Sequence, residues 1–327
     1  MQKEIGGYLN LDLTPSEEVP HTDGVFVNSG RHAIEYILRT IPHIETIWIP
    51  FYTCRVVLEP ILKLGLKYKR YRINKNLEIA EDITLGKNDF ILVSNYFGIK
   101  DSYIKKTLST YGSNVIIDNA HALFTPCCPG YMTAYSPRKM IGVADGGIAY
   151  TPFKYNGKAL QKDVSYLRSI FLLKRLDLGS AAGYKDSKDC NKSIENTELK
   201  EMSSLSKALY FATDFNRIKN TRRENFILLH NALGKWNEFN IPNFEDFSCP
   251  LIYPFFFKDS GLRSFLISNN VFVPVYWPYV KEVAPENSTE LELMDHIIAL
   301  PIDQRYGKEE MDYIVRLINR YITGLNK

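Results

Sequence analysis

Two ionisable residues, Asp118 and Lys139, stand where their side chains can take part in chemistry. Asp118 directly follows an apolar run, so its carboxylate is expected to be partly desolvated, which is unfavourable unless a cation or a hydrogen-bond donor meets it. Lys139 ends the turn SPRK and is followed by an acidic residue and a glycine pair, at 145 to 147. Each residue alone fits a capping aspartate or a solvated lysine, whereas the two together suggest a shared site.

A lysine held in a crevice forms an imine with a carbonyl cofactor, and pyridoxal phosphate needs such a lysine together with an acidic partner for its ring nitrogen. Here Lys139 is the candidate for the imine, and Asp118 is the candidate for keeping the ring nitrogen protonated. A strand-end aspartate followed by a serine-containing turn with a lysine resembles the fold type I pyridoxal-phosphate enzymes.

Strands and helices must bring these residues together, and from residue 24 the sequence alternates between the two patterns. This alternation predicts an α/β domain with a largely parallel sheet. The expected strands are 24–28, 46–50, 90–98 with a turn, and 114–121; the expected helices are 29–41, 55–65 and 103–112. Polar clusters follow four of the strands, at 28–31, 50–54, 94–98 and 118–121. Functional groups in such folds gather at the carboxyl ends of the strands, so these clusters are expected to converge.

The second half of the chain has a different organisation. Residues 178–201 are polar and weakly periodic, which predicts a long loop serving as a lid or an assembly arm. Residues 202–236 predict one long helix or a helix pair. Beyond them we expect strands at 251–257, 271–277 and 296–302 and helices at 261–270 and 308–322. The expected division is a large domain over 1–220, with an N-terminal arm, and a small C-terminal α/β domain over 221–327.

The overall composition limits which classes of protein this sequence can belong to. The 327 residues are 45% hydrophobic and carry 40 Lys and Arg against 37 Asp and Glu, a balance that gives no sign of a nucleic-acid or membrane-surface binder. The N-terminal stretch lacks the apolar core of a signal peptide, and no window reaches the roughly 18 apolar residues of a membrane helix, so the expected location is the cytoplasm. Five cysteines and six scattered histidines indicate neither a disulfide framework nor a metal site.

Several motifs together resemble the DegT/DnrJ/StrS-type sugar aminotransferases. The family motif D-x-A-(H/Q) is matched by Asp118 to His121, and the acidic residue and two glycines after the family's lysine are matched at the same spacing by residues 145–147. The segments IPFYTC, NSGRHAIEY and HIIALPIDQRYGKEEMDYIVRLI are similar to further family segments in the same order. The resemblance covers nearly the whole chain.

The resemblance implies a fold type I enzyme with a mostly parallel seven-stranded sheet in its large domain. It implies pyridoxal 5'-phosphate as cofactor, a nucleotide-linked keto-sugar as substrate, an amino-acid donor, and a homodimer, in the biosynthesis of surface polysaccharides or amino sugars. Lys139 and Asp118 are then catalytic. The other cofactor-binding residues implied are Ser29, Gly30, Arg31 and Ser136 at the phosphate, His121 at the ring oxygen, and Tyr52 as one aromatic candidate for stacking on the ring.

Four positions depart from the family pattern. Arg31 replaces the usual threonine of the phosphate turn and is either a phosphate ligand or a surface arginine. Ala134 stands where the family has a serine, although Ser136 lies closer to the lysine. Cys54 replaces the aromatic residue that covers the ring. The stretch G-Y-N-Y-R, which in the family reaches the neighbouring subunit's site, is not recognisable in residues 199–201.

Two other functions remain open from the sequence. One is a different pyridoxal-phosphate reaction on a related sugar, such as dehydration or elimination, although the family's dehydratases have histidine in place of the lysine. The other is a non-catalytic ligand-binding or regulatory protein that keeps the fold, which the changes at Cys54 and 199–201 leave possible. The basic and aromatic run KYKRYR at 67–72 fits an exposed edge strand better than a nucleic-acid site.

Overall fold

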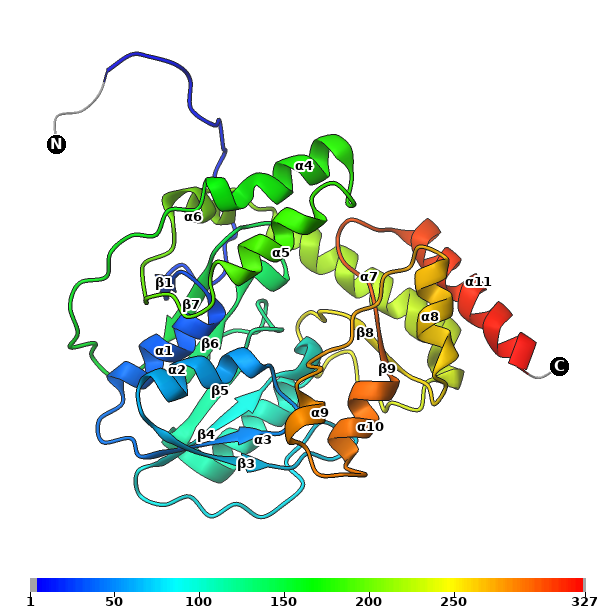
Figure 1. Cartoon of the computed structure of the whole chain (residues 1–327), viewed down its shortest axis with the longest axis horizontal. Coiled ribbons are helices and arrows are strands. Elements are labelled where there is room, and N and C mark those ends of the chain that lie inside the picture. Colours follow the sequence, from blue (N-terminus) through cyan, green and yellow to red (C-terminus); the bar gives the residue numbers. More distant parts are fainter. Residues whose placement is uncertain (1–4, 326–327) are drawn as a thin grey trace.

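The computed structural model describes residues 5–325, and its centre is a seven-stranded sheet (Figure 1). The strand order is β1-β7-β6-β5-β4-β2-β3, and only β7 runs antiparallel to its neighbours. The strands are β1 (Val25–Val27), β2 (Thr46–Pro50), β3 (Lys67–Tyr71), β4 (Asp89–Ser94), β5 (Val115–Asn119), β6 (Met132–Tyr135) and β7 (Gly147–Tyr150). The expected α/β class with a mostly parallel seven-stranded sheet is confirmed.

Both faces of this sheet are buried, as the alternation of side chains along its strands requires. In β4, Ile91 and Val93 belong to one apolar core, while Phe90 and Leu92 belong to another core on the opposite face. Helices α1 (Gly30–Thr40) and α2 (Leu58–Lys63) pack in the second core. Helix α3 (Asp101–Tyr111) and the C-terminal part of the chain pack in the first. The sheet is therefore the middle layer of three.

Helix α1 begins where the sequence predicts. Ser29 is its N-cap and accepts a hydrogen bond from the backbone N–H of His32, while Ile34, Ile37 and Leu38 repeat at helical spacing and are buried. The predicted helix over 55–65 forms as a short 3-10 turn followed by α2. Pro60 falls in the first turn of α2, where its missing N–H breaks no helical hydrogen bond.

The C-terminal part carries its own two-stranded antiparallel sheet, β8 (Tyr253–Phe256) with β9 (Ile297–Leu300). Helices α6 (Ser204–Phe211) and α7 (Phe215–Leu233) are the predicted helix pair, and α7 leads from the large sheet towards the small one (Figure 1). The remaining helices here are α8 (Gly261–Ser268), α9 (Val280–Val283), α10 (Thr289–His296) and α11 (Lys308–Leu325).

Two expectations for this half are wrong. The predicted loop over 178–201 contains a helix, α5 (Tyr184–Lys192), which forms a hairpin with α4 (Ile170–Leu178). An ion pair of 2.8 Å between Lys174 and Asp186 ties the two helices together. Because α5 is held by charge pairs and buries only Cys190, its sequence lacks the apolar periodicity that would have predicted it.

The predicted strand over 271–277 does not form, and the chain there is irregular. Pro274 has no backbone N–H to donate to a ladder, and Trp277 adopts a positive φ of 55°, which turns the chain away from an extended course. Val271 and Val273 are nevertheless buried. The apolar run therefore reflected burial rather than a strand.

The two edges of the large sheet are β1 and β3. Along β1, residues 200–202 pair with the strand, through hydrogen bonds from the N–H of Asn28 to the Lys200 carbonyl and from the N–H of Met202 to the Phe26 carbonyl. The other edge, β3, contains the basic run predicted to be an exposed edge strand, and that interpretation is confirmed.

Candidate active site

The predicted polar clusters meet at one edge of the sheet, beyond the carboxyl ends of its parallel strands. Asp118 lies near the end of β5, opposite Ser94 of β4 and Ala134 of β6 in the strand register. The Ser29–Gly30 turn follows β1, and Lys139 follows β6. The topology thus gathers residues that are far apart in sequence, as expected from the rule for parallel sheets.

Lys139 ends a short 3-10 turn, Pro137–Lys139, whose start is set by the proline. The side chain of Lys139 is accessible to solvent, and protein atoms nevertheless surround it on most sides. It therefore stands in an open hollow of the molecule and not on an outer surface. Desolvation in the hollow lowers the pKa of Lys139, and the charges of Arg138 and Arg31 lower it further, against the opposing influence of Cys54 and Asp118. A lowered pKa leaves more of the amine unprotonated and nucleophilic at a given pH.

Asp118 and His121 share this hollow with Lys139. Burial raises the pKa of the Asp118 carboxyl, while the Ala120 backbone N–H, which donates to its Oδ1 over 3.0 Å, together with Lys139 and Ser94, acts in the opposite direction. Burial and the neighbouring Lys139 ammonium hold the pKa of His121 well below its usual value, so its imidazole is neutral. A half-buried carboxylate beside an amine matches the pair expected from the sequence.

The Ser29–Gly30 turn packs tightly against the turn that carries Lys139. A Cβ placed on Gly30 would lie 2.9 Å from the Cβ of Ser136, and one on Gly147 would lie 2.1 Å from the Ser29 carbonyl oxygen. Gly146 has a φ of 140° and its N–H donates to the Asn28 carbonyl over 2.9 Å. The glycine pair is therefore required for β7 to pass directly beside the first turn of α1.

Asp145, the acidic residue before the glycine pair, has a structural role. It is fully buried and accepts hydrogen bonds from the Ser203 N–H, the Ser203 hydroxyl and the Ser206 hydroxyl, at 2.7, 2.7 and 2.5 Å. Ser203 is in turn the N-cap of α6. Asp145 thus joins the start of β7 to the start of α6 and does not face the hollow.

Arg31 lies in the first turn of α1 and forms an ion pair with Glu59 in the first turn of α2. Both carboxylate oxygens of Glu59 lie 2.5 Å from the same nitrogen, Nη1. The alternative that Arg31 is a solvated surface residue does not fit, because only 12% of its side chain is exposed. Its charge contributes to the lowered pKa values of both Lys139 and Arg138.

Tyr52, the aromatic candidate named from the sequence, is a core residue. Tyr52, Tyr96 and Phe97 are all buried, and the Tyr52 hydroxyl has no hydrogen-bond partner among the described residues. Trp277, which the sequence analysis did not select, joins this cluster: its ring lies 4.7 Å from that of Tyr52 and nearly parallel to that of His121, with centroids 5.5 Å apart. The run PVYWPY was read as strand, so its aromatic residues were not considered as site residues.

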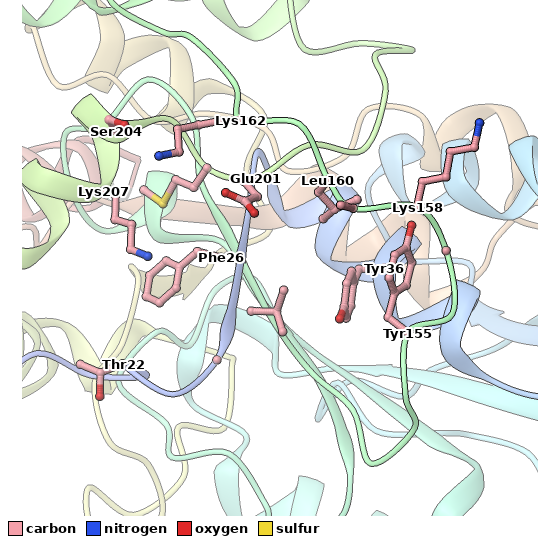
Figure 2. Close-up of a pocket in the computed structure, with 15 residues that line it drawn as sticks. Thr22, Phe26, Tyr36, Tyr155, Lys158, Leu160, Lys162, Glu201, Ser204 and Lys207 are labelled. Carbon is pink, nitrogen blue, oxygen red and sulfur yellow. The ribbon is translucent and has the colours of Figure 1, made fainter. Parts of the chain in front are cut away.

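Two cavities are prominent. One, of about 360 Å³, is lined by Lys139 together with four arginines; these are Arg138, Arg175, Arg222 and Arg305. The other, of about 420 Å³, lies along β1 (Figure 2). Figure 2 shows Lys162 and Lys207 near Phe26 and Glu201, with Tyr36 and Tyr155 stacked farther along. Of the eight residues predicted for the site, Lys139 is among those that line the first cavity, and none is among those that line the second. The first cavity therefore borders the candidate site on the side of Lys139.

Arg138 adjoins Lys139 in the sequence, with a role that the sequence left open, whereas Glu59 and the other three arginines of the smaller cavity were missed by the sequence analysis. Glu59 lies 28 positions from Arg31 in the chain, and Arg222 comes from α7, where it donates to the Leu251 carbonyl and to Gln304. Only the packing of α1 on α2, and of the C-terminal part on the large sheet, reveals these neighbours. No local motif marks them.

No protein-family model and no curated protein matches the sequence. Solved structures do match. DesV from S. venezuelae, in complex with a ketimine intermediate, is 14% identical with a TM-score of 0.64 over 91% of this chain and 84% of that chain. A DegT DnrJ EryC1 StrS aminotransferase from Brucella abortus is 15% identical, with a TM-score of 0.60 over 91% and 85%. NtdA from Bacillus subtilis, with bound cofactor PMP, is 14% identical, with a TM-score of 0.62 over 91% and 73%.

These likenesses confirm the fold expected from the motifs: the chain has the fold type I architecture of the sugar aminotransferases. Within residues 5–325, no helix combines the length and apolar character needed to cross a membrane. In the same range, no group of three or more His, Cys, Asp or Glu side chains is placed to hold a metal ion.

Proposed function

We propose that this protein is a pyridoxal-phosphate-dependent aminotransferase acting on a keto-sugar, in the biosynthesis of surface polysaccharides or amino sugars. The observation that carries the proposal is the position of Lys139 beside Asp118 in an open hollow, next to the first turn of α1, on a sugar-aminotransferase fold. Each part is needed: an amine to hold the cofactor, a carboxylate for its ring nitrogen and a helix N-terminus for its phosphate.

The residues of the hollow fit this cofactor. Gly30 lacks the Cβ that would collide with Ser136, so the first turn of α1 lies directly against the serine of the Lys139 turn. The backbone N–H groups of a helix N-terminus and a serine hydroxyl are both donors suited to a phosphate. Arg31 and Arg138 place two permanent cations beside Lys139, and a dianionic phosphate is the kind of ligand that such a pair attracts. Burial raises the pKa of Asp118, so its carboxylate is best satisfied by a cationic partner such as a protonated ring nitrogen.

When bound, pyridoxal phosphate supplies an aldehyde that condenses with amines and a ring that withdraws electrons from the attached carbon. Lys139 is the nucleophile, and its lowered pKa favours the neutral amine. After an amino donor has taken its place, the Nζ of Lys139 is free to take a proton from the donor carbon and to return one to the sugar carbon. Asp118 would hold its negative charge at the ring nitrogen, and His121, which is buried and neutral, would contact the ring oxygen.

The finer parts of the proposal concern partners and location. We infer a nucleotide-linked keto-sugar, an amino-acid donor, a homodimer and a cytoplasmic location. The four arginines of the cavity beside Lys139 support an acidic donor and a phosphate-bearing sugar, because guanidinium groups pair well with both anions.

The test is a visible absorption spectrum of the purified protein with added pyridoxal phosphate. The wild type is expected to develop a band that Lys139→Ala lacks, because the band requires the lysine amine. Lys158→Ala, in the cavity of Figure 2, is the matched control and should keep the band. A band that persists in Lys139→Ala would remove Lys139 from this role. A band without amino transfer from any donor to any keto-sugar would contradict the aminotransferase function.

A further inference from the structure

The first turn of α1 carries Arg31, and one of the three guanidinium nitrogens of this side chain is already paired with a carboxylate. Glu59 contacts Nη1 of Arg31 through both of its oxygens, at 2.5 Å each. Among the described residues, neither Nε nor Nη2 of Arg31 has a hydrogen-bond partner, and neither atom is sealed from solvent. These two nitrogens form the lateral edge of the guanidinium, which binds two oxygens of one phosphate through parallel N–H donors. Glu59 thus occupies the nitrogen that this edge does not use.

The backbone of Arg31 lies next to the candidate phosphate site. Arg31 follows Gly30, which touches Ser136, and Ser136 lies in the turn that carries Lys139. The charge of Arg31 also acts on Lys139 and on Arg138. An unpaired guanidinium on a helix surface would sample many rotamers, whereas one held at Nη1 keeps its orientation and loses less entropy when it binds an anion.

The segment that would otherwise provide a phosphate donor from a second subunit is held by its own chain. Residues 200–202 pair with β1 through the hydrogen bonds between Asn28 and Lys200 and between Met202 and Phe26. Glu201 pairs further with Gln161 and Asp163. The main chain of residues 200–202 is therefore committed within its own subunit, whereas the first turn of α1 lies directly against the turn that carries Lys139.

We propose that Glu59 is a positioning residue that holds Arg31 at Nη1, so that the Nε and Nη2 edge binds the phosphate of the cofactor. This inference rests on the proposed function for the identity of the ligand, and on the Arg31–Glu59 geometry for the role of Glu59. The ligand chemistry is a phosphate monoester or inorganic phosphate.

The test compares three ligands: pyridoxal phosphate, pyridoxal, which has the same aldehyde without the phosphate, and inorganic phosphate. Binding of the two aldehydes is followed by absorption, and binding of phosphate to the cofactor-free protein by calorimetry. Glu59→Ala is expected to weaken pyridoxal phosphate and phosphate by about tenfold, since a hydrogen bond to a charged group is disturbed. Pyridoxal affinity should not change. Glu59→Gln, whose amide oxygen still accepts from Nη1, should bind within about threefold of the wild type.

Two further variants make the test specific to the pair. Arg31→Met should weaken the phosphate ligands at least as much as Glu59→Ala does. The double variant should be no weaker than Arg31→Met alone, because Glu59 acts only through Arg31. Circular dichroism spectra verify that the variants are folded.

The outcomes separate the two proposals. Unchanged or tighter phosphate binding in Glu59→Ala overturns the positioning role, as does an equal loss of pyridoxal affinity. If the wild type shows no absorption band with either aldehyde, yet Glu59→Ala loses phosphate affinity, the aminotransferase proposal fails while the anion site at Arg31 stands.

Discussion

His121 is a buried imidazole beside an ammonium group, and both features keep its pKa well below its usual value of 6.5. The unfolded chain takes up a proton at this residue below about pH 6.5, whereas the folded chain does not. Lowering the pH therefore favours the unfolded state, at about 1.4 kcal/mol for each pH unit between 6.5 and the folded-state pKa. The same sign holds for His21, His32 and His230, whose pKa values are lowered mainly by burial.

We therefore expect the cofactor-free protein to lose stability between pH 7.5 and 5.5 and His121→Gln to lose less. The free-energy difference between wild type and His121→Gln should shift by about 1 kcal/mol in favour of the variant over the unit from pH 6.5 to 5.5, because the histidine of the unfolded chain is already half protonated at pH 6.5. Urea unfolding at the three pH values measures it. Phe97→Leu, which changes a neighbouring non-titrating ring, should show a constant difference. A constant difference for His121→Gln as well would mean that its imidazole titrates alike in both states.

At the scale of elements, the contact between β7 and α1 depends on Gly147. An alanine Cβ there would overlap the Ser29 carbonyl oxygen and carbon, which are backbone atoms and cannot rotate aside. Gly147→Ala should destabilise the protein by about 1–3 kcal/mol, the usual cost of forcing an extra carbon into a packed site. It should also weaken pyridoxal-phosphate binding, because the Ser29–Gly30 turn has to move.

Thermal unfolding and absorption titration test both effects. Gly307→Ala is the control, since its added Cβ would meet no atom within 4 Å. If Gly147→Ala unfolds at the wild-type temperature and binds the cofactor normally, the close packing of β7 on the α1 turn is not what positions the phosphate site.

Local sequence patterns determine which helices, strands and site residues of this protein could be predicted from the sequence. The strands β1, β2, β4 and β5 and the helix α1 were predictable because apolar periodicity, the Ser29 cap and the turn residues all agree locally. The strands β6 and β7, on either side of the Lys139 turn, were not predicted individually. Asp118 and Lys139 were selected from their residue types and from the spacing of the motifs around them. Trp277 and Glu59 were not, because their contacts depend on how distant elements pack. A strand was wrongly predicted at 271–277 because a short apolar run looks the same in the sequence whether it forms a strand or a buried irregular segment.

At the scale of the whole molecule, an unusual number of large apolar side chains is exposed on and around the α4–α5 hairpin. The side chains more than half exposed are Val164, Tyr166, Leu167, Leu173, Leu176, Leu178 and Tyr184. Exposed apolar side chains that gather on one part of a protein commonly mark a protein–protein contact. The same hairpin lines the cavity beside Lys139, through Phe171, Leu172 and Tyr184 among others. We propose that this surface forms the homodimer contact.

Sedimentation velocity tests this contact. The wild type is expected to be a dimer, and the double variant Leu173→Glu with Leu176→Glu a monomer, because a charge buried in an apolar contact is costly. Phe272→Glu, at a similarly exposed apolar residue outside the hairpin, should remain a dimer. A monomeric wild type, or a dimer that survives the double change, would show that the hairpin does not join two copies.

The pairing of residues 200–202 along β1 has a further consequence for how copies of this chain can meet. An uncovered edge strand presents free N–H and C=O groups on which another chain can extend the sheet, and such growth is open-ended. At the β1 edge, these backbone groups already form hydrogen bonds with Lys200 and Met202. On the other side, β3 has exposed Lys67 and Lys69, whose like charges repel a copy of themselves. The molecule is thereby protected against fibrous growth at both ends of its sheet, which leaves side-chain surfaces as the means of assembly.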